Sequence, residues 1–460
     1  MNFLSDPSTS KKMQVMGQKV RWGDRVITQQ NIDQTRLKLD DEQAQQPNFS
    51  FLVLGDTDAG LEAQQNPQWE IARALLPHLD TCRFTLHTGD VTYPLGAAEF
   101  YLNHFITPYR DLLLRGTQPN GNSPLVFSSP FFPVPGNHDY YDLAPIPKFL
   151  TTLLKPLQRW IKLSPNWASS GQGSAYAKIF LDCLEQPQTL AALNQHLQQH
   201  YTAQTETGRC LRYQPGKFTR LPNRYYTFQY RGIDFFALDS NTFNKRQTVS
   251  SDQLETDLEQ LEWLQQQLIN SWHCSHIRGR VIYLHHPPYT TESLHFDQPE
   301  VLAVRHHLRR VFDRVAKAVS PLPQNQPLVN LILSGHAHCL EHIRTLDTGY
   351  ADRHLDWIVC GGSGVSLRRQ RQGDSQLMEI SEHGGARHIR AVAQSHLFIG
   401  RRKQGTQVHN PHTFLRIDVE DGIPPKFTIR PFVVEQQQQW SSYPLKPIII
   451  SLVVQKSLEQ

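Results

Sequence analysis

Two acidic side chains follow an apolar run near the start of the chain. The segment VLGDTDAG at residues 53–60 places Asp56 and Asp58 two positions apart. On an extended backbone, side chains two apart point to the same side, so both carboxylates can face one point in space. Carboxylate oxygens suit hard metal cations, although Asp and Gly are also common turn residues. This segment alone therefore leaves a metal site and an ordinary turn as alternatives.

Four further segments place polar residues at the end of an apolar run. GDVTY carries Asp90 and Tyr93, GNHD carries Asn137 and His138, LHHPP carries His285 and His286, and GHAH carries His336 and His338. Each segment alone has a structural explanation, as a turn, a strand terminus or a surface pair. Together they indicate a dinuclear metal site, because such a site needs several Asp, Asn and His ligands that converge from separate loops.

The elements that must position these groups alternate along the chain. Seven short apolar runs are typical of buried strands: FSFLVLGD, CRFTLHTGD, PFFPVPGNHD, IDFFALDSN, RVIYLHHPP, LVNLILSGHAH and LDWIVCGGSG. Between them, QWEIARALLPHL and SDQLETDLEQLEWLQQQLINS place apolar residues three and four positions apart, as surface helices do. The alternation predicts a layered α/β core with one shared site at the carboxyl ends of the strands.

The order of the polar blocks resembles that of the calcineurin-like metallophosphoesterases. That family is recognised by GD, GDxxY or GDxxD, GNH, a histidine near a strand end, and GHxH, and all five blocks occur here in that order. GDVTY and the run from AEFYLNHF to PFFPVPGNHDYYD are most similar to the purple acid phosphatase branch. The resemblance implies a four-layer α-β-β-α sandwich, in which helices flank two packed sheets.

The resemblance also implies roles for individual residues. Asp90 resembles the carboxylate that bridges two cations held ~3.5–4 Å apart. Asp56 and His338 would join it on the first metal. The second metal would be completed by one amide oxygen and two imidazoles, those of Asn137, His285 and His336. In HHPP the family pattern favours His285 because its ligand commonly lies two residues before the first proline.

Asp58 and Tyr93 are alternatives for the remaining position on the first metal. Most of the family has histidine two residues after the first aspartate, whereas the purple branch commonly has glycine there and takes a tyrosinate from GDxxY. A Tyr93 phenolate requires a strongly Lewis-acidic ion such as ferric iron, because a free phenol titrates near pH ~10. An Asp58 ligand would favour manganese or iron over zinc. We favour Tyr93, and we expect two ions of iron or manganese, with zinc and magnesium as alternatives.

The reaction that the resemblance implies is hydrolysis of a phosphate monoester or diester. Two cations neutralise phosphate oxygens and lower the pKa of a bridging water, so that hydroxide attacks phosphorus in line with the leaving group. His138, beside Asn137, resembles the general acid that protonates the leaving alkoxide. Asp139 either orients His138 or caps the turn.

Two other functions are open alternatives. One is hydrolysis of a nucleotide or nucleic-acid diester, which the arginine-rich stretch 366–407 favours. The formal net charge of +4 is too small to indicate a nucleic-acid partner by itself. The other alternative is a non-catalytic metal-binding scaffold protein; against it, the expected acid and nearly all expected ligands are present.

The 460 residues, of which 39% are apolar, favour one enlarged catalytic domain over residues 47–435. Residues 1–46 are polar and predict a weakly ordered lead-in, and residues 436–460 form a C-terminal extension. Residues 143–222 are mainly helical in pattern and predict a cap inserted into the core. The stretch 366–407 is expected to be a basic loop, either solvated or a clamp for an anionic substrate.

Cysteine usage and the absence of long apolar runs bear on the compartment. The six cysteines form no CxxC pair, so buried free thiols are expected rather than a zinc ribbon or a disulfide framework. The first 20 residues lack the apolar region of a signal peptide, and no apolar run is long enough to span a bilayer. We therefore expect a cytoplasmic protein whose partner is a phosphate ester.

Overall fold

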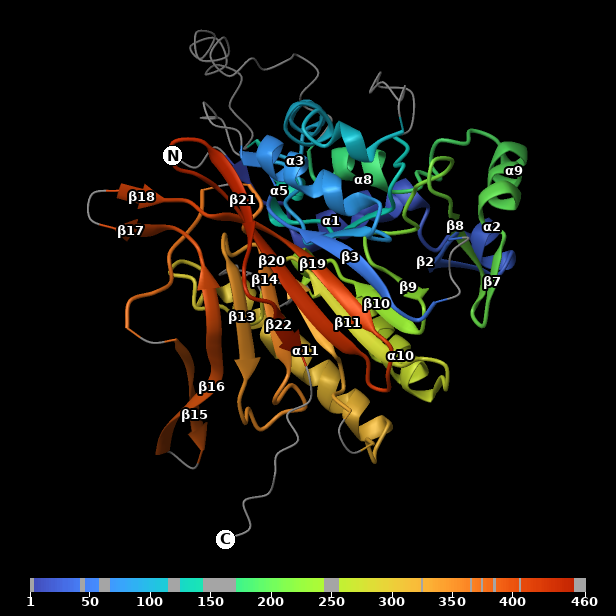
Figure 1. Cartoon of the computed structure of the whole chain (residues 1–460). Coiled ribbons are helices and arrows are strands. Elements are labelled where there is room, and N and C mark those ends of the chain that lie inside the picture. Colours follow the sequence, from blue (N-terminus) through green and yellow to red (C-terminus); the bar gives the residue numbers. More distant parts are fainter. Residues whose placement is uncertain are drawn as a thin grey trace, which may run out of the picture.

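Two large β-sheets packed face to face form the middle of the molecule (Figure 1). The computed structural model describes residues 4–41, 46–57, 67–114, 125–143, 171–243, 256–323, 326–364, 366–373, 375–383, 386–404 and 407–450. Helices cover the outer faces of the sheets, so the predicted α/β sandwich of four layers is confirmed.

In the described part of the chain, the larger sheet has eleven strands. Their order is β15 (Gln376–His383), β16 (Ala386–Ile399), β13 (Leu340–Thr345), β14 (Asp356–Cys360), β12 (Leu331–Ser334), β11 (Gly279–Leu284), β10 (Ile233–Ala237), β9 (Tyr226–Tyr230), β2 (Ile32–Leu39), β8 (Gly208–Tyr213) and β7 (Ala203–Thr205). The central strands β10, β11, β12 and β14 are parallel. Every residue of these four strands is buried, which explains why their sequences are almost continuously apolar.

The smaller sheet has seven strands among the residues that the structure describes. Six follow the order β21 (Trp440–Pro444), β20 (Lys426–Gln436), β19 (His412–Glu420), β3 (Phe49–Leu54), β4 (Thr85–His87) and β5 (Phe131–Pro133), and β22 (Ile448–Ile450) also pairs with β20. Strands β3, β4 and β5 are parallel, so their carboxyl ends meet at one edge. The stretch predicted as a C-terminal extension contributes β21 and β22, so its described part belongs to this sheet.

Aromatic side chains fill the space between the two sheets. Phe51 of β3 stacks on Phe84, which precedes β4, with 5.2 Å between ring centroids. Phe235 of β10 meets both rings edge-on, at 5.5 Å from Phe51 and 5.3 Å from Phe84. Contacts of this geometry stabilise a core beyond the burial of apolar area alone. The three rings therefore fix the spacing of the two sheets below the polar edge where their strands end.

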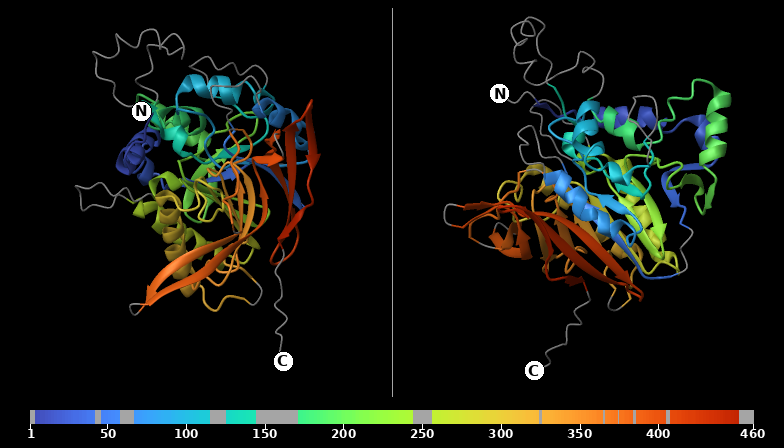
Figure 2. Two further views of the ribbon diagram at one scale, coloured as in Figure 1. Left: turned by 90° about the vertical axis from the view of Figure 1, so that its left-hand side faces the viewer. Right: turned by 45° about the horizontal axis from the view of Figure 1, so that its top comes forward.

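The two helices expected from apolar spacing are present on opposite outer faces. α3 (Pro67–Leu79) covers the smaller sheet, where His78 lies 4.6 Å from the Phe432 ring of β20. α10 (Leu258–His273) packs beside α11 (Pro299–Ala318) against the larger sheet (Figure 2). No helix in the described part of the chain is both long and apolar enough to cross a membrane.

The N-terminal stretch differs from the weakly ordered lead-in that its composition predicted. α1 (Thr9–Val20) and α2 (Arg25–Gln29) precede β2, which lies between β8 and β9 in the larger sheet. Met16 and Val20 are fully buried, four positions apart on one face of α1. The few apolar residues in this polar stretch lie at helical spacing. This spacing allows α1 to bury one face, although the overall composition of the stretch is polar.

The stretch 143–222 is only partly helical where the structure describes it. Residues 171–222 contain α8 (Ser174–Phe180) and α9 (Leu190–His200), followed by β7 and β8, which extend the larger sheet through β2. The amphipathic helical pattern at 148–162 lies outside the described residues. The remaining short elements are β1 (Leu4–Ser5), α4 (Ala98–Phe100), η1 (Tyr101–Ile106), η2 (Arg110–Leu112), α5 (Asn137–Tyr140), β6 (Asp142–Leu143) and η4 (Ser240–Thr242).

The stretch 366–407 is not the loop that its arginines suggested. Most of it forms the long hairpin of β15 and β16, which extends away from the rest of the sheet (Figures 1 and 2). A second hairpin consists of β17 (Arg402–Gln404) and β18 (Gln407–His409). Leu377, Val392 and Ala393 are buried in the core beneath α11, so apolar residues anchor strands within a strongly charged sequence.

Candidate metal centre

The predicted ligands that the structure describes come together where the parallel strands of both sheets end. Asp56 follows β3 and Asp90 follows β4, while Asn137 opens α5 shortly after β5. From the larger sheet, His285 directly follows β11, and the loop from β12 to β13 carries His336 and His338. We use the term candidate metal centre for seven side chains, those of Asp56, Asp90, Tyr93, Asn137, His285, His336 and His338.

One half of the candidate metal centre surrounds the hydroxyl group of Tyr93. This hydroxyl lies 2.6 Å from Asp90 Oδ2 and 3.0 Å from Asp56 Oδ1. It also lies 3.0 Å from His338 Nε2, which is 3.6 Å from Asp56 Oδ1. Four potential ligand atoms from two sheets thus face one small volume.

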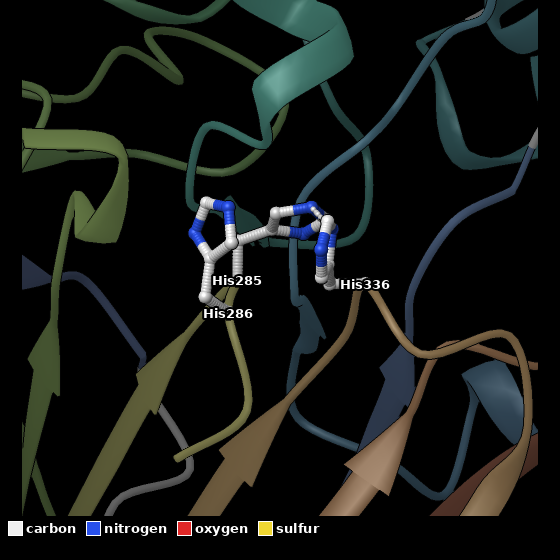
Figure 3. A group of neighbouring side chains, drawn as sticks. All are labelled: His285, His286 and His336. Carbon is white, nitrogen blue, oxygen red and sulfur yellow. Dashed lines mark hydrogen bonds between the residues drawn. The ribbon is translucent and has the colours of Figure 1, made fainter. Parts of the chain in front are cut away.

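The other half is formed by one amide oxygen and two imidazole nitrogens. Asn137 Oδ1 lies 2.9 Å from His285 Nε2 and 3.0 Å from His336 Nδ1, and these two nitrogens are 3.2 Å apart. Figure 3 shows the rings of His285 and His336 approaching each other from neighbouring loops. Asp90 Oδ2 is 3.4 Å from His285 Nε2. Because the same oxygen also contacts Tyr93, Asp90 lies between the two halves.

The outer nitrogens of these histidines face oxygen acceptors. His285 Nδ1 lies 2.9 Å from the carbonyl oxygen of Thr88, and His338 Nδ1 lies 3.2 Å from that of Ser366. His336 Nε2 lies 3.4 Å from Gln298 Oε1. Because these oxygens only accept, each outer nitrogen carries a proton, and in the neutral ring the inner nitrogen presents a lone pair. Such outer hydrogen bonds orient histidine ligands in metal sites.

This arrangement fits a metal ion. When both imidazoles are neutral, Asn137 Oδ1, His285 Nε2 and His336 Nδ1 are all acceptors. Three converging lone pairs repel one another unless a cation, or in its absence a proton on His285, lies among them. Nitrogen, amide oxygen and carboxylate ligands together suit transition metals such as iron, manganese or zinc.

The backbone at three of these residues is strained. Asp56, Asp90 and His336 have φ values of 55°, 52° and 65°, in the left-handed region that side chains with a Cβ rarely adopt. Such conformations cluster at functional sites, where surrounding contacts hold them. Position 136 requires glycine because the backbone passes close to Asp90, and a Cβ there would lie 2.1 Å from Asp90 Oδ1. These loops are shaped to bring the polar groups together.

Burial and mutual charge shift the titration of these side chains. Asp56 and Asp90 expose no surface. Burial raises the pKa of Asp56 well above its usual range. Burial would also raise the pKa of Asp90. The positive charges of His285 and His138 have the larger effect, and they hold the pKa of that carboxyl below its usual range. Burial lowers the pKa of His285, yet the Asp90 carboxylate reverses this effect and raises it to about 9. The buried carboxylates thus depend on a positive charge close to them.

His138 lies against the candidate metal centre without belonging to either half. Its backbone N–H donates to Asp90 Oδ1 at 2.8 Å, and its ring lies 4.0 Å from that of Tyr93 between centroids. His138 Nδ1 is 3.0 Å from the carbonyl oxygen of Pro94, so Nδ1 carries a proton. The other ring nitrogen, Nε2, is therefore the atom that exchanges a proton.

Asp139 is bound into the turn that precedes α5. Its Oδ2 accepts the backbone N–H of Gly136 at 2.8 Å, and its Oδ1 accepts the hydroxyl of Tyr101. Burial and the neighbouring Asp90 raise the pKa of Asp139 to about 7. These contacts correspond to the capping alternative for Asp139.

His286, which the sequence analysis also named, makes none of the contacts described above. His286 turns toward η4, where its Nδ1 is 2.9 Å from the hydroxyl of Ser240, although Figure 3 shows its ring beside those of His285 and His336. Asp58 lies outside the described residues.

Sequence reasoning did not name His295, which borders the candidate metal centre. Its ring centroid is 4.4 Å from that of His336 and 6.1 Å from that of His338. His295 Nδ1 contacts the buried carboxylate of Glu292, which also accepts the backbone N–H of Leu294 at 3.0 Å. His295 follows no apolar run, and only the fold of the loop after HHPP brings it here.

Solved structures of three other proteins resemble this one at low sequence identity. GAP50, the anchor in the inner membrane complex of Plasmodium, is 12% identical with a TM-score of 0.44, over 88% of this chain and 89% of that chain. The purple acid phosphatase PPD1 from yellow lupin (Lupinus luteus) seeds is 12% identical with a TM-score of 0.44, over 87% of this chain and 54% of that chain. PhoD is 11% identical with a TM-score of 0.42, over 88% and 70%.

A comparison with curated proteins finds no match. A protein family does match, namely the calcineurin-like phosphoesterases, over residues 49–340. These residues make up more than half of the chain and include all seven side chains of the candidate metal centre. The chain therefore belongs to the calcineurin-like phosphoesterase family.

Proposed function

We propose that this protein hydrolyses phosphate esters at the candidate metal centre with the help of two metal ions. The observation that carries the proposal is the convergence of the Asn137, His285 and His336 acceptor atoms beside a second group of ligand atoms around Tyr93. Asp90, which contacts both groups, is the bridging ligand in this proposal. Metal ions, when bound, screen the charge of a phosphoryl group and lower the pKa of a bound water.

The ligands divide into two sets. One ion takes Asp56, Tyr93 and His338, the other takes Asn137, His285 and His336, and Asp90 belongs to both. Tyr93 is favoured over Asp58 because its hydroxyl lies within 3.0 Å of Asp56, Asp90 and His338. Burial and the two nearby carboxylates raise the pKa of Tyr93 well above its usual range. A strongly Lewis-acidic ion such as ferric iron is needed to stabilise its phenolate.

His138 is the general acid in this proposal. When water replaces the leaving group on phosphorus, the bond between phosphorus and the leaving oxygen breaks, and that oxygen takes a proton from His138 Nε2. The contact of Nδ1 with Pro94 and the ring contact with Tyr93 fix the direction of this nitrogen. His295, held by Glu292, borders the centre on the side of His336 and is placed to contact substrate oxygens.

The test combines elemental analysis with a two-substrate assay. The purified protein is assayed with p-nitrophenyl phosphate and bis(p-nitrophenyl) phosphate, with and without added manganese, iron, magnesium or zinc. We expect two bound ions per chain and metal-dependent hydrolysis of at least one substrate. Stronger hydrolysis of the diester would favour the phosphodiesterase alternative. Two bound ions without hydrolysis of either substrate would instead indicate the non-catalytic metal-binding scaffold.

A further inference from the structure

Glu341 is a buried carboxylate that the proposed function does not use. It lies on β13, the strand that follows the loop of His338, and it exposes no surface. Its Oε2 accepts the hydroxyl of Thr290 at 2.8 Å and the N–H of Thr291 at 3.0 Å, and its Oε1 accepts the hydroxyl of Thr291. A buried carboxylate is stable only when hydrogen bonds compensate for its lost hydration. Here three donors of one loop do so, and they fix the start of that loop against β13.

The hydroxyl of Thr290 connects Glu341 to the residue that holds His295. This oxygen donates its proton to Glu341 and accepts the N–H of Glu292 at 3.1 Å. The carboxylate of Glu292, which is also fully buried, contacts His295 Nδ1. A continuous series of hydrogen bonds therefore runs from Glu341 through Thr290 and Glu292 to the His295 ring.

Thr291 is held from its other side by the segment that follows β14. Gln370 Nε2 donates to the Thr291 hydroxyl oxygen at 3.0 Å, and Arg371 N–H donates to the Thr291 carbonyl oxygen at 2.9 Å. The start of the loop is thus fixed between this segment and Glu341. Without the Glu341 carboxylate, the donors of Thr290 and Thr291 would be buried without an acceptor, which favours a shift of the loop.

We propose that Glu341 is a positioning residue that holds His295 against the substrate through Thr290 and Glu292. The inference rests on the proposed function, in which His295 contacts substrate oxygens. Because His295 Nδ1 faces Glu292, Nε2 is the nitrogen that meets the substrate. The His295 ring centroid lies 4.4 Å from that of His336, so a small shift of the loop moves Nε2 away from a phosphoryl group at the candidate metal centre.

Binding of inorganic phosphate to the metal-loaded protein tests the inference without turnover. Calorimetric titration compares the wild type with Glu341→Gln, His295→Ala and the variant that carries both substitutions. Glu341→Gln keeps one acceptor oxygen and replaces the other by an amide that donates. We expect each single substitution to weaken phosphate binding about 3- to 30-fold. The double variant should bind phosphate within about twofold of His295→Ala, because both substitutions remove the same contact.

Thr290→Val provides a second route to the same test. It removes only the hydroxyl that links Glu341 to Glu292, and its side chain is similar in size to that of threonine. It should weaken phosphate binding as Glu341→Gln does, and it should add no further loss to His295→Ala. Elemental analysis should find unchanged metal content in every variant.

Glu435→Gln is the matched control, because Glu435 is a buried carboxylate whose partners lie on β18 and β21. It contacts His409 Nδ1 at 2.9 Å and accepts the hydroxyl of Tyr443 at 3.3 Å. This substitution should lower the urea midpoint of unfolding and leave phosphate binding unchanged. A loss of phosphate binding equal to that in Glu341→Gln would show that any buried carboxylate has this effect, and it would overturn the inference.

Three further results would overturn the role of Glu341. The first is unchanged phosphate binding in Glu341→Gln or in His295→Ala. The second is a loss in the double variant equal to the product of the two single losses, because Glu341 would then act independently of His295. The third is loss of metal from Glu341→Gln, because Glu341 would then support the loop of His338. A protein that shows the expected binding pattern but hydrolyses no phosphate ester would overturn the proposed function alone.

Discussion

His138 is the residue whose role can be separated most clearly from metal binding. Its backbone N–H, which donates to Asp90 at 2.8 Å, is kept in His138→Ala, and its side chain is none of the seven that form the candidate metal centre. We expect His138→Ala to retain both metal ions. Turnover should fall by about two to four orders of magnitude for alkyl phosphates and much less for p-nitrophenyl phosphate, whose leaving group needs little protonation. Elemental analysis and steady-state kinetics with both substrates measure these effects.

Asp139→Asn is the control for this prediction. Asp139 caps the turn before α5, and its substitution should lower stability without changing the ratio of rates for the two leaving groups. If His138→Ala reduces turnover equally for alkyl and nitrophenyl phosphates, His138 is not the general acid.

The two alternative ligands, Tyr93 and Asp58, predict different colours for the iron-loaded protein. A phenolate bound to ferric iron produces a visible charge-transfer band, and the Tyr93 hydroxyl lies where such a bond would form. We expect the oxidised, iron-loaded protein to be coloured, the band to disappear in Tyr93→Phe, and the band to survive in Asp58→Ala. Absorption spectroscopy at matched iron content measures this. A colourless diiron protein, or a band that persists in Tyr93→Phe, would assign the position to Asp58.

At the scale of elements, the sequence predicted the strands and helices whose formation depends on residues adjacent in the chain. The strands that end near Asp56, Asp90 and His285 were recognisable because each is a short apolar run followed by polar residues. β16 was not recognisable, because its charged residues resemble a solvated loop and its pairing with β13 connects distant parts of the chain. His295 was missed for a related reason, since its position depends on the fold of a loop rather than on any local spacing.

A buried ionic cluster joins several of these elements below the candidate metal centre. Arg224, which precedes β9, donates to Asp239 at 3.0 Å and to Asp257 at 2.5 Å. Asp239 also accepts the hydroxyl of Tyr140 in α5, at 2.6 Å. Asp239 and Asp257 are fully buried. The cluster therefore connects η4 and the start of α10 to the helical turn that carries Asn137.

Removing the only cation described in this cluster should be strongly destabilising. Arg224→Ala leaves two buried carboxylates without their partner, which costs about 3–5 kcal/mol in comparable cases. The free energy of unfolding, measured in urea, should fall by that amount. Arg73→Ala is a suitable control, because the Arg73 side chain is 72% exposed and pairs with Glu70 at the surface. Its effect should stay below about 1 kcal/mol. Equal effects of the two substitutions would mean that the cluster does not contribute to stability as described.

At the scale of the whole molecule, the candidate metal centre joins the two sheets. Asp56, Asp90 and Asn137 follow strands of the smaller sheet, whereas His285 and His336 follow strands of the larger one. The family motifs made this meeting point predictable from sequence. The size of the sheets was not predictable, because β2, β15 and β22 join them from stretches whose composition suggested a lead-in, a loop and an extension.

Metal binding should therefore stabilise the whole fold. Each ion present at about a thousand times its dissociation constant adds about 4 kcal/mol to the free energy of unfolding. We expect EDTA to lower the denaturation midpoint of the wild type by a corresponding amount. In Asp90→Asn the effect of EDTA should largely disappear, because the substitution removes the ligand that contacts both halves and one of the two buried charges that hold the cations. Urea denaturation with and without EDTA, at known metal content, measures both effects.

Metal-free Asp90→Asn should also be less stable than the metal-free wild type at neutral pH. Without cations, the Asp90 carboxylate pairs with His285, which lowers the pKa of Asp90 and raises that of His285 to about 9, and asparagine would leave the buried imidazolium without this partner. Equal stability of the two metal-free proteins would show that this pair does not contribute to the fold independently of metal. If Asp90→Asn retains two tightly bound ions and full stabilisation by them, Asp90 is not the bridging ligand, and the division of the ligands into two sets must be redrawn.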